Sequence, residues 1–138
     1  MLIEQKLHIA LEDVLGFVAD FIKKLEPFKI NKDKLFDIKL CLSEALINAV
    51  KYGNKMDKNK PVLLKLAASV DSVKIEVKDQ GSGFDWNSLP SPIDNHNLDK
   101  LTGRGVFLIK NLMDKVEFSD GGSRIRMVKY LKKGKVKR

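Results

Sequence analysis

The spacing of apolar residues in the first third of the chain predicts two helices. Between residues 11 and 25 these residues recur every three or four positions, as on one face of an amphipathic helix. A second helix is expected from Asn31, whose side chain can cap it, to about Tyr52. Gly53 and Asn54 are suited to end that helix.

After the second helix the pattern changes to the partial alternation that is typical of β-strands. Residues 62–70 and 73–77 are apolar and rich in β-branched side chains, and Asp71 and Ser72 between them predict a hairpin turn. Residues 80–102 are rich in Gly, Ser, Pro, Asn and Asp, so a long loop is expected, of a length that is usually functional or mobile. Further elements are expected at residues 2–9 (strand), 106–113 (helix), 116–119 and 124–131 (strands).

Helices and strands in this order predict an α+β fold, a two-layer sandwich with helices on one face of a mixed, mainly antiparallel sheet. The other sheet face is expected to be largely polar, because polar residues recur along the central strands, namely Lys65, Lys74, Glu76 and Lys78. A chain of 138 residues, 43% of them hydrophobic, can form one core. We therefore expect a single domain at residues 1–131 and a basic, disordered tail at residues 132–138.

The positive net charge of the chain is concentrated in this tail. The net charge is +8, and the last seven residues hold five positive charges, which leaves about three over the rest of the chain. The tail can attract polyanions such as nucleic acids, or it can be a solvated terminus. Because so little of the excess lies in the domain, we favour the second interpretation and expect no direct nucleic-acid contact.

Composition also indicates the compartment. No apolar run approaches the roughly 20 residues that a membrane-spanning helix needs, and the N-terminus lacks the pattern of a secretory signal. Cys41 is the only cysteine, which excludes an intramolecular disulfide and suggests a buried helix residue. We expect a cytoplasmic protein without a membrane partner.

The second helix contains the first candidate site. Glu44, Asn48 and Lys51 fall on one narrow arc of this helix together with Asp33 and Asp37. The amide oxygen of Asn48 is a suitable ligand for Mg²⁺, and a carboxylate one turn away could deprotonate a nucleophile that attacks a phosphate. Lys51 could add positive charge near such phosphates. The alternative for this arc is an ordinary solvated stripe.

The second candidate site follows the hairpin. Asp79 ends a strand and precedes Gly81 and Gly83. An ionised aspartate only accepts hydrogen bonds, so it can select an adenine amino group, while the glycines permit positive φ and a close approach of the backbone to a flat base. Ser123, after two glycines, lies either in a simple hairpin turn or beside that base. An Asp-x-Gly turn is also common after strands for structural reasons alone.

The third candidate site is the sequence Gly103-Arg104-Gly105, which is expected to precede an apolar helix. The N-terminal N–H groups of such a helix can bind phosphates. The spacing is neither that of a Rossmann fingerprint nor that of a P-loop. A flexible loop with a helix cap is the alternative.

The three sites together resemble a known family, the GHKL-type ATP-binding fold of histidine kinases, gyrase-type ATPases, heat-shock chaperones and bacterial anti-sigma factor serine kinases. Glu44-x-x-x-Asn48-Ala49 is similar to the family's N box, and Asp79-x-Gly81-x-Gly83 to its adenine-binding box. Gly103-Arg104-Gly105 is similar to its lid-to-helix glycine box. The resemblance covers residues 5 to 131, and the small size of the chain favours the anti-sigma factor kinase branch.

This resemblance implies ATP and Mg²⁺ as cofactors, with Asn48 as the metal ligand and Glu44 as the catalytic base toward a serine or threonine hydroxyl. It implies that Asp79 and Ser123 select adenine and that the glycines shape the pocket and its lid. It also implies a homodimer that binds a sigma factor and phosphorylates a STAS-domain antagonist.

Some positions depart from the pattern of the family. Tyr52 stands where close relatives often have histidine, and residues 84–102 show no pattern that can be aligned. His8 and His96 lack the context of a phosphoacceptor histidine. Two hypotheses therefore stay open: a serine/threonine kinase, or a catalytically weak, ATP-gated protein that sequesters a regulatory partner without phosphorylating it.

Overall fold

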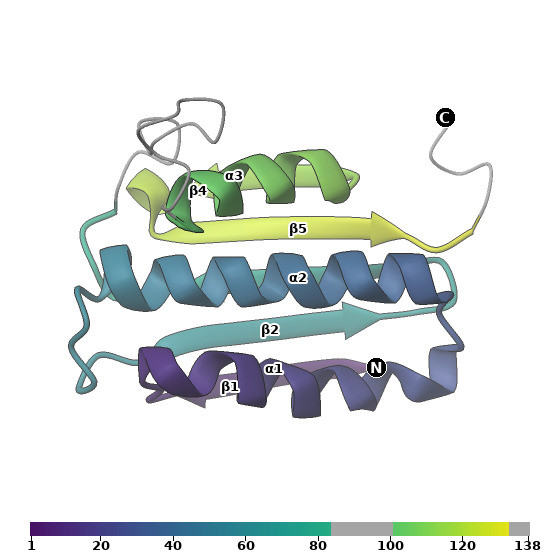
Figure 1. Cartoon of the computed structure of the whole chain (residues 1–138), viewed down its shortest axis with the longest axis horizontal. Coiled ribbons are helices and arrows are strands. Elements are labelled where there is room, and N and C mark those ends of the chain that lie inside the picture. The colour runs from purple at the N-terminus through teal and green to yellow at the C-terminus, as the bar shows by residue number, and fades with distance from the viewer. Residues whose placement is uncertain (84–100, 133–138) are drawn as a thin grey trace.

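The computed structural model describes residues 1–83 and 101–132, with side chains from residues 101–105 left out. In this part, five strands form a sheet in the order β1-β2-β3-β5-β4, and three α-helices lie on one of its faces (Figure 1). The strands are β1 (Leu2–Leu7), β2 (Val62–Ala68), β3 (Ser72–Lys78), β4 (Lys115–Ser119) and β5 (Arg124–Tyr130). The helices are α1 (Val14–Ile22), α2 (Lys32–Asn48) and α3 (Leu101–Leu112).

The predicted α+β two-layer arrangement is confirmed. The four strand pairings in the described residues are all antiparallel, so this part of the sheet has no parallel pair of the kind that a mixed sheet would contain. The helix α2 lies between α1 and α3 (Figure 1). The predicted loop residues 84–100, which include His96, and the tail residues 133–138 lie outside the described residues.

The helices follow the predicted positions with some differences at their ends. Asn31 caps α2 as predicted, because its Oδ1 accepts a hydrogen bond from the backbone N–H of Lys34 at 2.9 Å. The first predicted helix is α-helical only from Val14 to Ile22, with 3₁₀ turns on both sides. After Asn48 the second helix continues as a π-helical turn, Ala49–Gly53.

Two predicted boundaries are wrong. The turn between β2 and β3 comes one residue earlier than Asp71-Ser72, because the Ser69 hydroxyl accepts the N–H groups of Asp71 and Ser72. Residues 103–105 do not precede the third helix but lie inside it, since the backbone is helical from Leu101. Glycine is compatible with helical φ and ψ, so the apolar helix extends N-terminally through both glycines.

The hydrophobic core lies between the sheet and the helices. Alternate residues of the central strands are buried on the helix side, and α2 is the most buried helix, with a buried face that includes Ile38, Leu42 and Leu46. None of the helices in the described residues is both long and apolar enough to cross a membrane.

The face of the sheet that points away from the helices bears a row of charged residues across all five strands. Paired neighbours in this row alternate in sign: Glu4, Lys65, Glu76, Arg126 and Glu117. The Arg126 guanidinium donates a 2.8 Å hydrogen bond to Glu76. Leu63, Ala67 and Val128 also lie on this face, so it is mixed rather than uniformly polar.

Gly16 offers a test of the α1 helix. It is exposed, and a Cβ at this position would meet nothing within 4 Å beyond the helix's own backbone. Because glycine inside a helix is less favourable than alanine by about 0.5–1 kcal/mol, we expect Gly16→Ala to raise the free energy of unfolding by about that amount. Urea unfolding followed by circular dichroism measures the change. A decrease in stability would show that residue 16 does not have the helical environment described.

Candidate functional site

The helix α2 places Glu44 and Asn48 one turn apart and inside the protein. Glu44 is 7% exposed and Asn48 is 0% exposed, whereas Asp33 and Lys51 on the same predicted arc are exposed. Glu44 and Asn48 therefore do not belong to a solvated stripe. The middle of the predicted polar arc is therefore buried, while its ends are exposed.

These two side chains have polar atoms without partners among the described residues. Oε2 of Glu44 and both Oδ1 and Nδ2 of Asn48 are buried and make no hydrogen bond there. Most buried polar groups are paired, and an unpaired one typically costs about 1–3 kcal/mol. Three such atoms on successive turns of one helix indicate a binding site for a polar ligand.

Burial also changes the acid–base properties of this region. Desolvation raises the pKa of Glu44 above its ordinary value. Burial raises the pKa of the Cys41 thiol to about 12, with the nearby Asp37 carboxylate adding to this effect. Cys41 is therefore a protonated, buried helix residue, as its sequence context suggested.

A partly buried ion pair fixes α2 and α3 to the sheet beside this region. The ammonium group of Lys129 on β5 lies 3.0 Å from Oδ2 of Asp37 on α2. The same group donates to the carbonyl oxygen of Leu112, the last residue of α3. A cation at this end of a helix is also favoured by the helix dipole.

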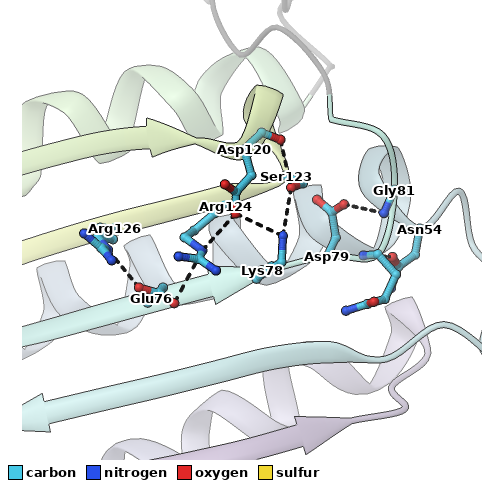
Figure 2. A network of polar contacts seen from close by, with 10 residues as sticks. Asn54, Glu76, Lys78, Asp79, Gly81, Asp120, Ser123, Arg124 and Arg126 are labelled. Atoms are coloured by element: carbon cyan, nitrogen blue, oxygen red, sulfur yellow. Dashed lines mark hydrogen bonds and ion pairs between the residues drawn. The ribbon is translucent and has the colours of Figure 1, made fainter.

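Asp79 directly follows β3 and is only 2% exposed. Its Oδ1 accepts the backbone N–H of Gly81 at 2.8 Å (Figure 2), and its own N–H donates to the carbonyl oxygen of Ser123 at 2.9 Å. Desolvation raises its pKa, while the Gly81 hydrogen bond and the charge of Lys78 act in the opposite direction. Asp79 is thus a buried carboxylate held by backbone groups of two loops.

Glycines allow three backbone segments to meet around Asp79. A Cβ on Gly53 would lie 2.1 Å from the Asp79 carboxyl group, and one on Gly81 would lie 2.1 Å from the carbonyl oxygen of Gly53. Gly83 has the positive φ of 95° that its motif suggested and packs against Gly121. Positive φ is therefore required at Gly83, whereas Gly81 is required for close approach.

The structure joins Ser123 to Asp79 through the backbone. The Ser123 hydroxyl donates to the carbonyl oxygen of Asp120 at 3.0 Å and accepts from Lys78 Nζ at 3.2 Å. Lys78 also lies 3.1 Å from Asp120 Oδ2, which gives the compact polar group in Figure 2. Ser123 thus lies beside Asp79, and its hydroxyl is bound to other groups of the protein.

The other predicted site residues are less closely connected. Lys51 is exposed, and its ammonium group lies 5.7 Å from the centre of the Tyr52 ring, so its described contact is not with Glu44 or Asn48. Gly103 and Gly105 contribute helical backbone of α3, while the side chain of Arg104 is outside the description.

Sequence patterns missed the site roles of Gly53, Asn54, Lys78 and Asp120. The sequence predicts only that Gly53 and Asn54 end a helix. A glycine that follows an N box is a usable signal, because the backbone there can approach another segment closely. The contacts of Lys78 and Asp120 depend on the pairing of β3 with β5, which has no local signal.

The residues fit a magnesium nucleotide better than a metal ion alone. Within residues 1–83 and 101–132, no three His, Cys, Asp or Glu side chains are grouped to hold a metal. Asn48 offers a single hard oxygen, and Mg²⁺ commonly takes few protein ligands and completes its coordination with phosphate oxygens and water. Asp79, which packs closely against Gly53 and Gly81, can accept a hydrogen bond from a base.

Comparisons with known proteins agree with this arrangement. The family model for histidine kinase-like ATPase domains matches residues 8–129. The chain is 39% identical over 115 residues to a protein of Staphylococcus epidermidis named serine-protein kinase RsbW, with 76% of this chain and 71% of that protein covered. A protein of the same name from Staphylococcus aureus strain MSSA476 is 37% identical over 113 residues, with the same coverage.

The close contact at Gly53 gives a prediction. The Cβ of Gly53→Ala would displace the Asp79 carboxylate, so we expect the affinity for ATP to fall by about tenfold or more, the equivalent of about 1.4 kcal/mol. Isothermal titration calorimetry measures the change. Gly16→Ala is the matched control, because it adds the same methyl group in open space and should bind ATP as the wild type does. Wild-type affinity in Gly53→Ala would contradict the described packing.

Proposed function

Because the chain belongs to the histidine kinase-like ATPase family, we propose that it is an ATP-dependent serine/threonine protein kinase that acts as an anti-sigma factor. The relatives named serine-protein kinase RsbW support the kinase class. The structural observation that carries the proposal is the buried, unpaired state of Glu44 and Asn48 on α2. A ligand with phosphate groups and a metal ion would satisfy these atoms.

The nucleotide is proposed to lie along the C-terminal part of α2. Asp79, in contact with Gly53 at the end of this helix, accepts a hydrogen from the adenine amino group. Asn48, one turn earlier, offers Oδ1 to Mg²⁺, which neutralises phosphate charge when bound. Glu44 lies a further turn away, at the end where the transferred phosphate belongs. Gly103, Arg104 and Gly105 in the first turns of α3 are proposed to contact phosphates.

Glu44 is proposed to act as the general base. It accepts the proton of a serine or threonine hydroxyl while that oxygen forms a bond to the γ-phosphorus of ATP. The bond from the γ-phosphorus to its bridging oxygen breaks, and ADP leaves. The raised pKa of Glu44 makes it a stronger base than a solvated glutamate, which suits this role.

The protein substrate is proposed to be a STAS-domain antagonist that competes with the chain for a sigma factor. Binding of the sigma factor would silence it, and phosphorylation of the antagonist would keep the sigma factor bound. A homodimer of the chain is part of the same proposal. These partners follow from the resemblance of the three motifs to anti-sigma factor kinases, and the name of the relatives supports the serine kinase activity.

Replacement of Glu44 tests the catalytic role. Glu44→Gln keeps the size of the side chain but cannot accept the proton, so we expect phosphate transfer to fall by roughly 10²- to 10⁴-fold while ATP still binds. The measurement is transfer from labelled ATP to a purified STAS-domain antagonist. Asp33→Asn is the matched control, since it changes an exposed carboxylate on the same helix and should leave the rate unchanged.

Two results would change the proposal. Wild-type transfer by Glu44→Gln would remove Glu44 as the base. A wild-type chain that binds ATP and the sigma factor but transfers no phosphate would favour the alternative of an ATP-gated, non-phosphorylating binding protein.

The pH dependence of transfer gives an independent prediction. Glu44 is protonated below its pKa and then cannot accept a proton, so the rate should fall as the pH is lowered through this value. Because desolvation raises that pKa, the fall should begin at a higher pH than for an ordinary glutamate. Rates at saturating ATP over a pH series measure this effect. The residual activity of Glu44→Gln should lack this decrease, and an identical decrease in both proteins would assign it to another group.

A further inference from the structure

We infer that Asn54 is a positioning residue for nucleotide selection, which holds the Asp79–Gly81 turn so that the Asp79 carboxylate can distinguish an amino group from a carbonyl on the purine ring. The inference rests on the proposed ATP site and names a residue that none of the three motifs contains. It concerns the specificity of the site, not the chemical step.

The side chain of Asn54 is buried and bonded at both ends. It is 2% exposed, and its Nδ2 donates to the carbonyl oxygens of Lys60 at 2.8 Å and Pro61 at 3.2 Å. Its Oδ1 accepts the backbone N–H of Gln80 at 2.7 Å. Both amide hydrogens and the acceptor oxygen are therefore used.

The backbone of Asn54 is fixed as well. Its N–H donates to the carbonyl oxygen of Ala49 at 2.8 Å, and its carbonyl oxygen accepts from the N–H of Asp57 at 3.0 Å. Asn54 thus connects the π-helical end of the second helix, the segment that enters β2, and the turn after β3. Figure 2 shows it beside the same turn that holds Gly81 and Asp79.

The hydrogen bond from Gln80 to Asn54 acts on the turn that orients the Asp79 carboxylate. Gln80 lies between Asp79 and Gly81, and the N–H of Gly81 is the group that holds Oδ1 of Asp79. The turn is also in close contact with the carbonyl oxygen of Gly53, the residue before Asn54. Without the Asn54 acceptor the N–H of Gln80 loses its partner, so the turn is held less firmly and the Gly81 bond that orients the carboxylate is weakened.

Selectivity between ATP and inosine triphosphate measures this orientation. Inosine has a carbonyl oxygen where adenine has an amino group, so an oriented Asp79 carboxylate accepts from ATP and repels the inosine oxygen. We expect the wild type to prefer ATP. In Asn54→Ala the ratio of the two dissociation constants should fall by about tenfold or more, because a buried acceptor has been lost.

Asn54→Asp separates positioning from stability. A carboxylate at residue 54 can still accept from the N–H of Gln80, but it cannot donate to Lys60 and Pro61. We expect this variant to retain more selectivity than Asn54→Ala even though its thermal stability is also reduced. Asn59→Ala is the matched control, since Asn59 is exposed in the same loop and its described contact uses the backbone N–H.

Calorimetric titrations with ATP and with inosine triphosphate, made on variants shown to be folded, test the role of Asn54. If Asn54→Ala loses stability but keeps the wild-type ratio, Asn54 is only structural and the inference is overturned. Asp79→Asn is tested alongside and should weaken ATP binding by about tenfold or more. If Asp79→Asn keeps both affinity and ratio, the proposed adenine site fails, which is a different outcome from failure at Asn54 alone.

Discussion

The site depends on one steric constraint, the contact of Gly53 with Asp79 and Gly81. At this point the π-helical turn that follows α2 meets the end of β3, and neither Gly53 nor Gly81 places a side chain between the two segments. The contact sets the position of Asp79 relative to the helix that bears Glu44 and Asn48. One helix therefore sets the distance between Glu44 and Asn48. The turn that follows this helix sets the position of Asp79 relative to both. The π-helical turn Ala49–Gly53 is the segment that brings Gly53 to this place.

The chemistry of the site follows from burial as much as from residue type. Glu44 and Asp79 are common side chains whose pKa values are raised because the fold removes them from water. Asn48 is an ordinary amide made unusual by the lack of a described partner. Such groups reduce the stability of the free protein, and a bound polar ligand would offset that loss. The unpaired groups thus lower the folding stability of the free protein and favour the binding of a polar ligand.

Local patterns predicted the elements of this fold well, because the periods of helix and strand are properties of short segments. The cap at Asn31 and the positive φ at Gly83 were predictable for the same reason. A helical wheel could place Glu44 and Asn48 on one arc but could not indicate that the fold buries these two side chains. The role of Asn54 also depends on a segment distant in sequence, the turn that contains Gln80, so no local pattern reveals it.

The charged row on the outer face of the sheet bears on how the strands find their register. A slip of one residue would turn core side chains outward, and the resulting loss of hydrophobic burial makes it unfavourable. A slip of two residues keeps every side chain on its own face, so it causes no such loss of hydrophobic burial. Around Lys65 and Glu76, however, such a slip would place Lys65 opposite Lys74 or Lys78, and like charges directly opposite are unfavourable. The alternation of signs along β3 thus disfavours a two-residue slip of β2 against β3, which the hydrophobic core alone would tolerate.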